Sequence, residues 1–162
     1  MANVVIRPAK AEDMKRVEEI AGEAWSGIHE VLRRLMGPGM HEALRRNWRE
    51  EKARDLNSHF QKHPECFLVA EAGGQVLGFV TFHIQAGGKL GVIGNNAVAN
   101  AARGKGLGPA MYRRVLDHFR QQGCSYAEVG TGLDDGHAPA RRAYEKVGFN
   151  VRIPHVTYYM AL

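Results

Sequence analysis

The sequence predicts an α+β fold in which a mixed, mostly antiparallel central sheet is flanked by helices. In the middle of the chain, three runs of β-branched and aromatic residues are separated by glycine pairs, a pattern typical of an antiparallel meander. On both sides of these runs, apolar residues recur at helical spacing, and strands alternate with helices in the second half. A length of 162 residues suits one hydrophobic core, so we expect residues 1–162 to form a single domain.

The first part of the chain is expected to form one strand followed by helices. The β-branched run at residues 4–6 ends close to Pro8 and predicts the first strand. Apolar residues at three- and four-residue spacing then predict amphipathic helices, interrupted by Gly27 and by the Gly-Pro-Gly sequence around Pro38. We expect these helices over residues 12–25, 28–36 and 40–60, the last one ending before Pro64.

The second part of the chain predicts most of the sheet and two further helices. Glycine pairs at residues 73–74 and 87–88 are suited to the turns between the meander strands. Gly123 and Gly148 follow helical patterns and are suited to end them. Strands are expected over residues 66–71, 75–84, 90–99 and 126–130, with two short final strands around Ile153 and Pro154 that end at residues 156–160; the helical stripes are Leu107, Met111, Val115 and Phe119, then Ala140, Ala143, Tyr144 and Val147.

The composition is ordinary for a soluble globular protein, with 44% apolar residues, 24% charged residues and a net charge of +5. This basic balance favours an anionic partner, which could be nucleic acid, an anionic membrane or a phosphorylated cofactor. Cys66 and Cys124 lie far apart without a CxxC pattern, so we expect two buried thiols in a reducing compartment. No apolar run approaches the roughly 20 residues that span a bilayer, and the first residues lack a signal-peptide pattern, which indicates a cytoplasmic protein.

A glycine-rich loop lies between a predicted strand and a predicted helix, and it reads Arg103-Gly104-Lys105-Gly106-Leu107-Gly108. Its glycines permit positive φ and allow a ligand to approach the backbone closely. The helix start offers free N–H groups and the positive end of the helix dipole, to which two cationic side chains are added. The loop therefore predicts an anion-binding site, the alternative being a well-capped turn without a ligand. Its spacing matches neither a P-loop nor the dinucleotide-binding fingerprint.

At these residues the chain resembles the GNAT superfamily of N-acetyltransferases. The cofactor loop of that family reads Gln/Arg-x-x-Gly-x-Gly/Ala, and Arg103, Gly106 and Gly108 fill its three defined positions. The strand before the loop, Asn95-Asn96-Ala97-Val98-Ala99, looks like the central strand of the family.

A second family pattern, roughly Asn-x-x-Ala-x-x-Leu-Tyr-x-x-x-Gly-Phe, lies at the expected distance after the first. Ala140, Tyr144, Gly148 and Phe149 match it, whereas His137 stands where Asn is usual and Ala143 where Leu is usual. The two patterns occur in order and on matching elements. The sequence at residues 6–9 and the tyrosine-rich last strand also look like the family, so the resemblance covers nearly the whole chain.

The resemblance implies a GNAT-like fold, splayed between its central strands, that holds the pantetheine arm of acetyl-CoA in the opening. It implies that backbone N–H groups of residues 103–108 bind the pyrophosphate, and that pantetheine pairs with the strand around residues 97–99. The cofactor-binding residues that it implies are Ala97, Val98, Ala99, Arg103, Gly104, Lys105, Gly106, Leu107, Gly108, His137 and Ala140, and it implies no metal.

In the family, an amine attacks the thioester directly in a ternary complex, and the tyrosine that corresponds to Tyr144 donates a proton to the departing thiolate. A phenol with a pKa near ~10 stays protonated at neutral pH and suits this catalytic role, the alternative being a core aromatic in the helical stripe. A backbone N–H near Val98 is the expected donor to the developing oxyanion. The general base is open, because Asn95 and Asn96 cannot usefully accept a proton. The candidates are a water relay, Glu71, His83, Asp134 and Asp135.

We therefore expect an acetyl-CoA-dependent N-acetyltransferase that acts on a primary amine of a small molecule or peptide, with a homodimer implied by the resemblance alone. The alternatives are a non-catalytic acyl-CoA-binding or sensing module and a basic nucleic-acid-binding domain. Interleaved acids at residues 45–54 favour a solvated face over a nucleic-acid site, and we expect no nucleic-acid or membrane partner. Within that stretch, Trp48 is expected near the acceptor entrance. His59 and His63 lack the glutamate of a zinc motif, and Pro64 follows them, so no metal site is expected there.

Overall fold

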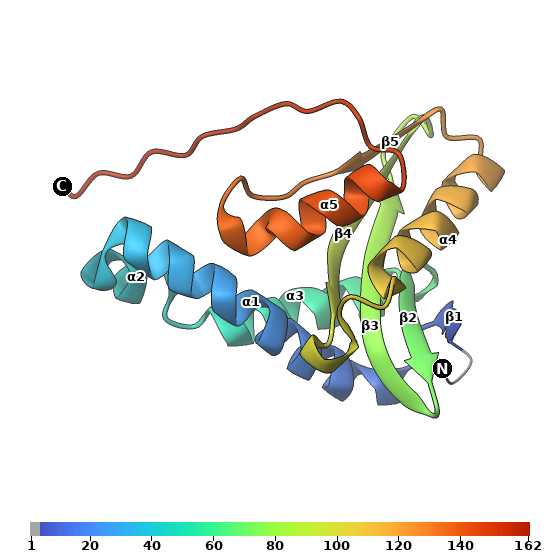
Figure 1. Ribbon diagram of the computed structural model, residues 1–162, viewed down its shortest axis with the longest axis horizontal. Helices are drawn as coiled ribbons and strands as arrows, with labels where there is room; N and C mark the ends of the chain where they lie inside the picture. Colours follow the sequence, from blue (N-terminus) through green and yellow to red (C-terminus); the bar gives the residue numbers. More distant parts are fainter. Residues whose placement is uncertain (1–3) are drawn as a thin grey trace.

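The computed structural model describes residues 4–162 and contains a five-stranded sheet with helices on both faces (Figure 1). The strand order is β1-β2-β3-β4-β5, with antiparallel pairing from β1 to β4 and parallel pairing between β4 and β5. The predicted mixed, mostly antiparallel sheet is therefore confirmed. The strands are β1 (Val5–Pro8), β2 (Phe67–Ala72), β3 (Gln75–Ile84), β4 (Leu90–Val98) and β5 (Tyr126–Val129).

Three helices precede the meander and two follow it. α1 runs unbroken through Gly27, so the predicted break at this glycine is wrong. A glycine inside an exposed helix costs about 1 kcal/mol, which the packing of the helix on its neighbours outweighs. The single helix predicted from residue 40 to residue 60 is instead two helices that meet at residues 46 and 47. The helices are α1 (Met14–Met36), α2 (Pro38–Arg45), α3 (Trp48–Lys62), α4 (Leu107–Gln121) and α5 (Ala138–Lys146).

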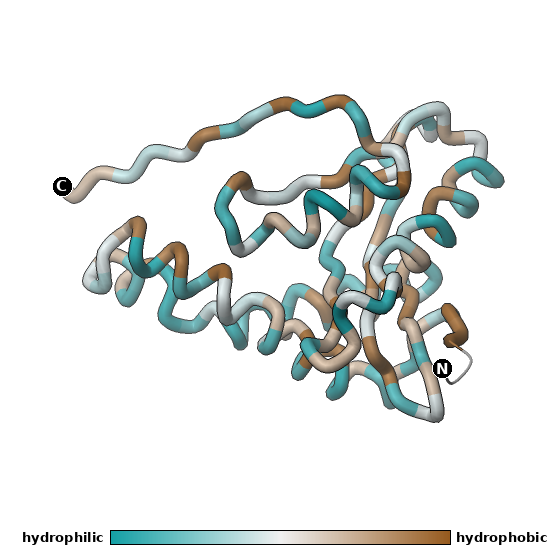
Figure 2. Tube along the Cα trace, in the orientation of Figure 1, coloured by the Kyte–Doolittle hydropathy of each residue, from teal (hydrophilic) through white to brown (hydrophobic). Residues whose placement is uncertain are grey.

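The core lies between the sheet and the apolar faces of these helices. The aromatic rings of Phe67, Phe79 and Phe82 are fully buried along the meander strands. On α4, the predicted stripe is confirmed, since Met111 and Val115 are completely buried against the sheet. Figure 2 shows apolar positions gathered along the strands, with apolar and polar positions alternating along the helices, as expected for helices with one buried face.

The sheet is splayed between β4 and β5. Backbone pairing between the two strands ends at Ile93 and Val129, although β4 continues to Val98. Just beyond the last pair, β4 carries a bulge, because two of its residues lie opposite the single residue Thr81 of β3. The second half of β4 therefore has a strand on one side only, and its other backbone groups face the opening.

The two final strands that the sequence predicts are absent. Residues 147–162 contain no helix or strand, and the C-terminal segment runs as an extended chain past α5 towards α2 (Figure 1). An extended segment becomes a β-strand only when its backbone pairs with a neighbouring strand. Among residues 4–162, no strand pairs with the segment.

Candidate active site

The glycine-rich loop has the open backbone that the sequence predicts. Gly104 and Gly106 have φ values of 76° and 79°, which residues with a side chain rarely adopt, and Gly106 lies directly before the start of α4. Within residues 4–162, none of the backbone N–H groups of residues 104–108 donates a hydrogen bond. A Cβ atom added at Gly104 or Gly106 would meet nothing within 4 Å. The loop therefore presents a row of free donors beside open space, at the positive end of a helix.

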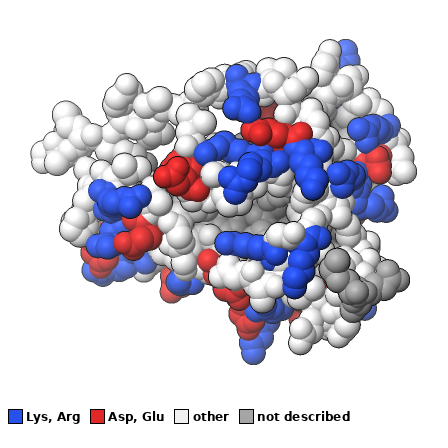
Figure 3. All heavy atoms as spheres, in the orientation of Figure 1, with Lys and Arg blue, Asp and Glu red and all other residues white. Residues whose placement is uncertain are grey.

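The two cationic side chains of the loop bend back onto the backbone that precedes it. The guanidinium of Arg103 donates to the carbonyl of Val98 at 3.3 Å, and the ammonium of Lys105 donates to the carbonyl of Ala101 at 3.0 Å. Both side chains stay exposed, so their charges add to the positive end of α4. Figure 3 shows Lys and Arg side chains gathered on two sides of a hollow in the middle of this face, over the region of α5 and the start of α4.

The second half of β4 directs its free backbone groups into the splay. The N–H of Ala99 donates to the carbonyl of Leu77 and so points towards β3. Backbone groups of successive residues in a strand point to opposite sides, so the N–H of Val98 points away from β3, towards the opening. Ala97 and Ala99 are buried and hold this stretch of strand against the core.

Tyr144, Asn96 and Tyr112 form a hydrogen-bonded cluster on the α4–α5 side of the splay. The hydroxyl of Tyr112 donates to Oδ1 of Asn96 at 2.7 Å. The amide nitrogen of Asn96 lies 3.1 Å from the Tyr144 hydroxyl, which is also 3.3 Å from Oδ1. The two phenol rings pack with their centroids 5.0 Å apart. Asn96, dismissed above as a base, thus orients two hydroxyl groups beside the opening.

Burial keeps both phenols in the cluster protonated. It raises the pKa of Tyr112, and the neighbouring Tyr144 raises it further. Burial also raises the pKa of Tyr144, although the hydrogen bonds from Asn96 and Tyr112 partly oppose this effect. At neutral pH, the Tyr144 hydroxyl is therefore an available proton donor.

The end of α5 explains how Tyr144 is held. The backbone N–H of Phe149 donates to the carbonyl of Tyr144, and its ring packs at 6.1 Å from the tyrosine ring. Gly148 has a φ of 110°, which lets the chain turn sharply after the helix. The second sequence pattern therefore has a structural basis, since its glycine and aromatic residues anchor the helix that carries Tyr144.

The loop before α5 positions His137 through an acidic partner. Nδ1 of His137 lies 2.6 Å from Oδ2 of Asp134. Burial would raise the pKa of Asp134, but the bond to His137 and nearby backbone donors outweigh it and hold the pKa below its usual value. The guanidinium of Arg141 donates to the carbonyls of Gly132 and Asp134 at 2.6 and 2.8 Å and fixes the loop. Asp134, a candidate base, is thus committed to holding His137.

A separate cluster on α1 and α3 faces the other side of β4. The ammonium of Lys52 donates to Oδ1 of Asn95 at 2.9 Å and lies 4.8 Å from the ring centre of Trp25. Burial lowers the pKa of Lys52. Trp48 stacks on His29 with the ring centroids 4.2 Å apart, and burial, followed by His41 and nearby cations, lowers the pKa of His29 to about 4. The placement of Trp48 near the acceptor entrance stays a prediction.

The structure does not bring the other base candidates to the cluster. Glu71 lies on β2, two strands away from β4, and pairs with Arg7 at 2.6 Å. His83 on β3 and Asp135 before α5 are exposed to solvent. His59 lies 3.2 Å from the carbonyl of Cys66, and its ring stands edge-on to the ring of His63 with the centroids 5.8 Å apart.

Among residues 4–162, no three His, Cys, Asp or Glu side chains are grouped as metal ligands would be. Within the same range, no helix combines the length and the apolar composition that crossing a bilayer requires. Both cysteines are free, and burial raises the pKa of Cys66 to about 11. Its thiol is therefore protonated and unreactive at neutral pH.

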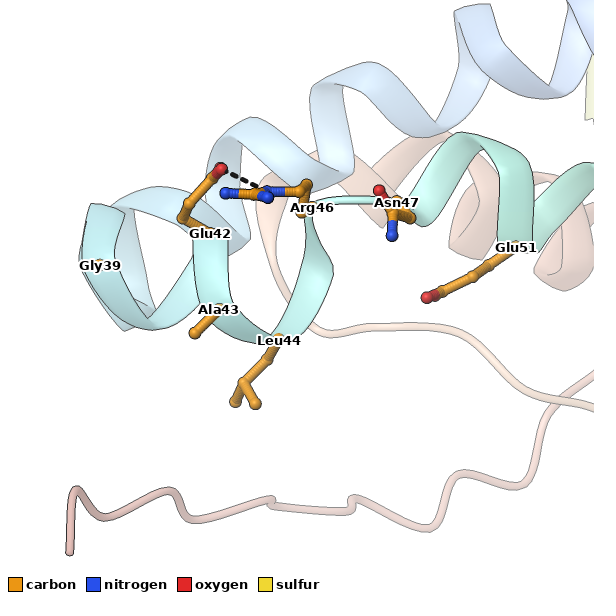
Figure 4. A pocket seen from close by; sticks show the side chains of 7 residues that line it. All are labelled: Gly39, Glu42, Ala43, Leu44, Arg46, Asn47 and Glu51. Carbon is orange, nitrogen blue, oxygen red and sulfur yellow. Dashed lines mark hydrogen bonds and ion pairs between the residues drawn. The ribbon is translucent and has the colours of Figure 1, made fainter.

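A surface pocket lies elsewhere, at the outer corner of α2 and α3 (Figure 4). It has a volume of about 560 Å³ and is open to solvent, and none of its lining residues belongs to the loop or to the tyrosine cluster. The candidate active site therefore lies at the splay and not in this pocket. Its lining residues are Gly39, Glu42, Ala43, Leu44, Arg46, Asn47 and Glu51.

Three residues that sequence reasoning does not assign to the site lie on the second half of β4 or contact it: Asn96, Tyr112 and Lys52. The sequence excludes Asn96 as a base, places Tyr112 outside the α4 stripe and predicts a solvated face at Lys52. Tyr112 alone has a usable sequence signal, because it lies three residues before Val115 and seven before Phe119 of the α4 stripe. The two others contact the site through bonds that span more than forty residues.

Comparison with protein families gives a match over most of the chain. Residues 15–149 match the Acetyltransferase (GNAT) family. Over 88 residues, 53% of this chain, the sequence is 36% identical to a mycothiol acetyltransferase of Corynebacterium glutamicum, but it covers only 28% of that protein. It is 26% identical to an uncharacterized N-acetyltransferase of Methanocaldococcus jannaschii, covering 96% of this chain and 84% of that one.

Solved structures share the fold at lower identity. The structure of PH1933 from Pyrococcus horikoshii aligns with a TM-score of 0.72 at 18% identity, covering 95% of this chain and 93% of that chain. AAC(6')-Iy in complex with the bisubstrate analogue CoA-S-monomethyl-acetylneamine aligns with a TM-score of 0.66 at 12% identity, covering 99% and 100%. These likenesses establish the fold of the chain.

Proposed function

Since the chain belongs to the acetyltransferase (GNAT) family, we propose that it is an N-acetyltransferase that moves an acetyl group from acetyl-CoA directly to a primary amine in a ternary complex. One observation carries the proposal. The splay between β4 and β5 has a row of free backbone donors at the start of α4 and a buried, protonated Tyr144 on one side. Anion binding and proton donation are the two functions that such a transfer requires of the protein.

The residues at the splay fit acetyl-CoA, which would supply the acyl group as a thioester. The free N–H groups of residues 104–108 would hold the pyrophosphate, because they point into open space at a helix N-terminus. Arg103 and Lys105 would add positive charge to that site. The backbone around Val98, flanked by Ala97 and Ala99, would lie along the pantetheine arm, and the outward carbonyl of Val98 would accept a hydrogen bond from one of its amides. His137 and Ala140, at the start of α5, would line the same arm.

On this proposal, Tyr144 acts as the general acid. As the new C–N bond forms and the C–S bond breaks, its hydroxyl gives a proton to the departing sulfur, and Asn96 holds the hydroxyl in position. The outward N–H of Val98 donates to the carbonyl oxygen on which negative charge develops. Each of these groups already has its orientation fixed by neighbours, so little reorganisation is needed.

The acceptor amine would enter from the α1–α3 side, opposite Tyr144. Trp25, Trp48 and Lys52 line this approach to β4. An ammonium group must lose a proton before it attacks, and the charge of Lys52 disfavours a second cation beside it. The free amine is therefore favoured at the site, and the proton can leave through solvent without a carboxylate on β4. Small-molecule and peptide amines are both compatible with this open approach.

The assignment of the loop can be tested with two glycine substitutions that flank α4, one at each end. Gly106→Val should weaken the binding of acetyl-CoA by tenfold or more, as measured by titration calorimetry, because the side chain obstructs the backbone donors. Gly123→Val is the matched control, since Gly123 has a φ of 80° at the other end of the same helix. Both variants carry a similar backbone strain of about 1–2 kcal/mol, but only the first alters the loop.

Equal affinities in the two variants would overturn the assignment of the loop. Turnover is measured separately, as thiol release with a panel of amines. If acetyl-CoA binds but no amine is turned over, the proposed enzyme function is wrong and the chain is a non-catalytic acyl-CoA-binding module.

A further inference from the structure

The ammonium of Lys52 is half-buried beside the splay and has no acidic partner. It lies 2.9 Å from the amide oxygen of Asn95 and 4.8 Å from the ring centre of Trp25, and both of these neighbours are uncharged. Within residues 4–162, no carboxylate lies within ion-pair distance of it. Asp55, whose charge acts on it from farther away, is exposed. The positive charge is therefore partly removed from water without a negative charge to offset it.

The bulge of β4 brings this ammonium to the opening. Asn95 lies in the bulge opposite Thr81, just beyond the last residue that pairs with β5. The hydroxyl of Thr81 donates to the carbonyl of Asn95 at 3.3 Å and fixes the backbone there. Bulges beside binding sites redirect side chains, and here the side chain of Asn95 meets Lys52 of α3. The next residue, Asn96, bonds to Tyr144 on the other side of the strand, so the ammonium and the proposed general acid flank the same stretch of β4.

Two guanidinium groups add positive charge to the same side of the splay. The guanidinium of Arg49 lies 4.4 Å over the ring of Trp48 and donates to the hydroxyl of Ser26 on α1 at 2.6 Å. Nε of Arg45 is buried and has no hydrogen-bond partner within residues 4–162. After burial, which has the largest effect, the charges of the surrounding cations lower the pKa of His29 further. The approach between α1 and α3 is therefore cationic as well as aromatic.

The carboxylates that lie nearest to this approach do not neutralise it. A groove of about 330 Å³ between α1 and α3 is lined by cationic and aromatic side chains of α3 and by three glutamates. Glu18 accepts a hydrogen bond from Asn57 at 2.6 Å. Glu19 pairs with Arg16 at 2.9 Å, and Glu50 is exposed. None of the three reaches the ammonium beside β4, which is left for a ligand.

We propose that the acceptor carries a carboxylate in addition to its amine, and that Lys52 binds this carboxylate; the inference rests on the proposed function and names its substrate class. An ammonium has three N–H donors, so the carboxylate accepts a charge-assisted hydrogen bond from one that Asn95 does not take. One negative charge matches the one half-buried ammonium. A carboxylate held beside β4 also limits the positions of the amine near the thioester. Lys52 is thus a residue that determines acceptor specificity.

Binding is measured first, by calorimetry on the protein saturated with CoA, which has no acyl group to transfer. The ligands are glycine, β-alanine and γ-aminobutyrate, each compared with its own amide, which lacks the negative charge. We expect the carboxylate of at least one pair to bind about tenfold more tightly than its amide, and Lys52→Met to reduce this ratio below about threefold. Arg54→Met is the matched control, because it removes the same charge from an exposed position of α3 and should keep the ratio. Circular dichroism checks that both variants are folded.

Turnover of the same ligands is measured separately, as thiol release from acetyl-CoA. The preference in kcat/KM should follow the preference in binding, and Lys52→Met should leave the KM for acetyl-CoA unchanged. The carboxylate site is overturned if no carboxylate binds more tightly than its amide, if Lys52→Met keeps the preference, or if Arg54→Met loses it as well. A preference that only Lys52→Met abolishes supports the site even when no amine is turned over. In that case the proposed acetyl transfer alone is wrong, so the two failures are distinguishable.

Discussion

At the scale of single residues, the interaction that distinguishes this site is the sharing of one amide between two buried phenols. Asn96 bonds to both hydroxyl groups, but only Tyr144 belongs to the helix that closes the α5 side of the splay. Tyr112 donates to Oδ1 and so completes the hydrogen bonding of the amide. This division suggests a catalytic role for Tyr144 and a positioning role for Tyr112.

Replacement of Tyr144 by phenylalanine tests that role. Tyr144→Phe removes the proton donor and keeps the ring, so kcat should fall by about 10²-fold while the affinity for acetyl-CoA stays within a factor of two or three. Stopped assays of thiol release give kcat, and calorimetry gives the affinity. Tyr126→Phe is the control, because Tyr126 is exposed and makes no side-chain hydrogen bond within residues 4–162. An unchanged kcat in Tyr144→Phe would reduce this residue to a core aromatic.

The sequence predicted some of the site residues but not the contacts between them. The loop at residues 103–108 and Tyr144 were predictable, because glycine spacing and a helical stripe are local properties of the chain. The bond between Asn96 and Tyr144 joins residues 48 positions apart, and no local pattern encodes it. The same holds for Lys52 and Asn95, whose contact depends on how α3 crosses β4.

At the scale of elements, one arginine connects the first strand, the second strand and the start of α1. Arg7 on β1 donates to both oxygens of Asp13, at 2.7 and 2.9 Å, and to Glu71 of β2 at 2.6 Å. Asp13 is 6% exposed and also accepts the backbone N–H of Lys10. The bond from Arg7 lowers the pKa of Asp13 more than burial raises it.

Arg7→Met should therefore lower the free energy of unfolding by about 2 kcal/mol, because it leaves the Asp13 carboxylate buried with its main partner removed. Arg16→Met is the control: the pairs of Arg16 with Glu19 and Glu23 are exposed, so its loss should cost less than about 0.5 kcal/mol. Urea unfolding at neutral pH measures both. Equal losses in the two variants would contradict the structural role of Arg7.

The pH dependence follows from the depressed pKa of Asp13. Its contribution to stability is fully present above the unfolded pKa of about 4 and is lost as the pH falls below that value through the folded pKa. In Arg7→Met, the pKa of Asp13 rises towards or above its unfolded value. Between pH 5 and pH 2, the free energy of unfolding of Arg7→Met should therefore fall less than that of the unmodified protein, because the contribution of Asp13 is missing.

The ends of the helices and strands show where local sequence propensity no longer predicts the structure. The strand over Gln75–Ile84 was predicted to the residue, because one glycine pair precedes it and another follows it. Gly27 was misread as a helix end, since its local cost is real but smaller than the stabilisation from packing on both sides of it. The final strands failed for a different reason: their pattern describes a strand correctly, but a strand requires a partner that the sequence does not identify.

At the scale of the whole molecule, part of the positive charge gathers at one place on the surface. Figure 3 shows basic side chains on two sides of the hollow near the start of α4, where the free backbone donors also lie. A low-dielectric hollow with basic walls concentrates the positive potential, which attracts a polyphosphate ligand. The sequence predicted an anionic partner from composition, but only the fold brings the charges to one site.

This arrangement predicts that the KM for acetyl-CoA depends on salt. The dependence should come from the phosphates of the acyl donor and not from its thioester arm. Raising the ionic strength from about 0.05 M to about 0.3 M shortens the Debye length and should raise the KM for acetyl-CoA several-fold. The KM for S-acetylpantetheine, which carries the same thioester without phosphates, should stay constant over the same range. Duplex DNA should not compete with acetyl-CoA at either salt concentration. If both donors responded equally to salt, the phosphates would not lie in the basic hollow, and the loop at residues 103–108 would lose its assigned ligand.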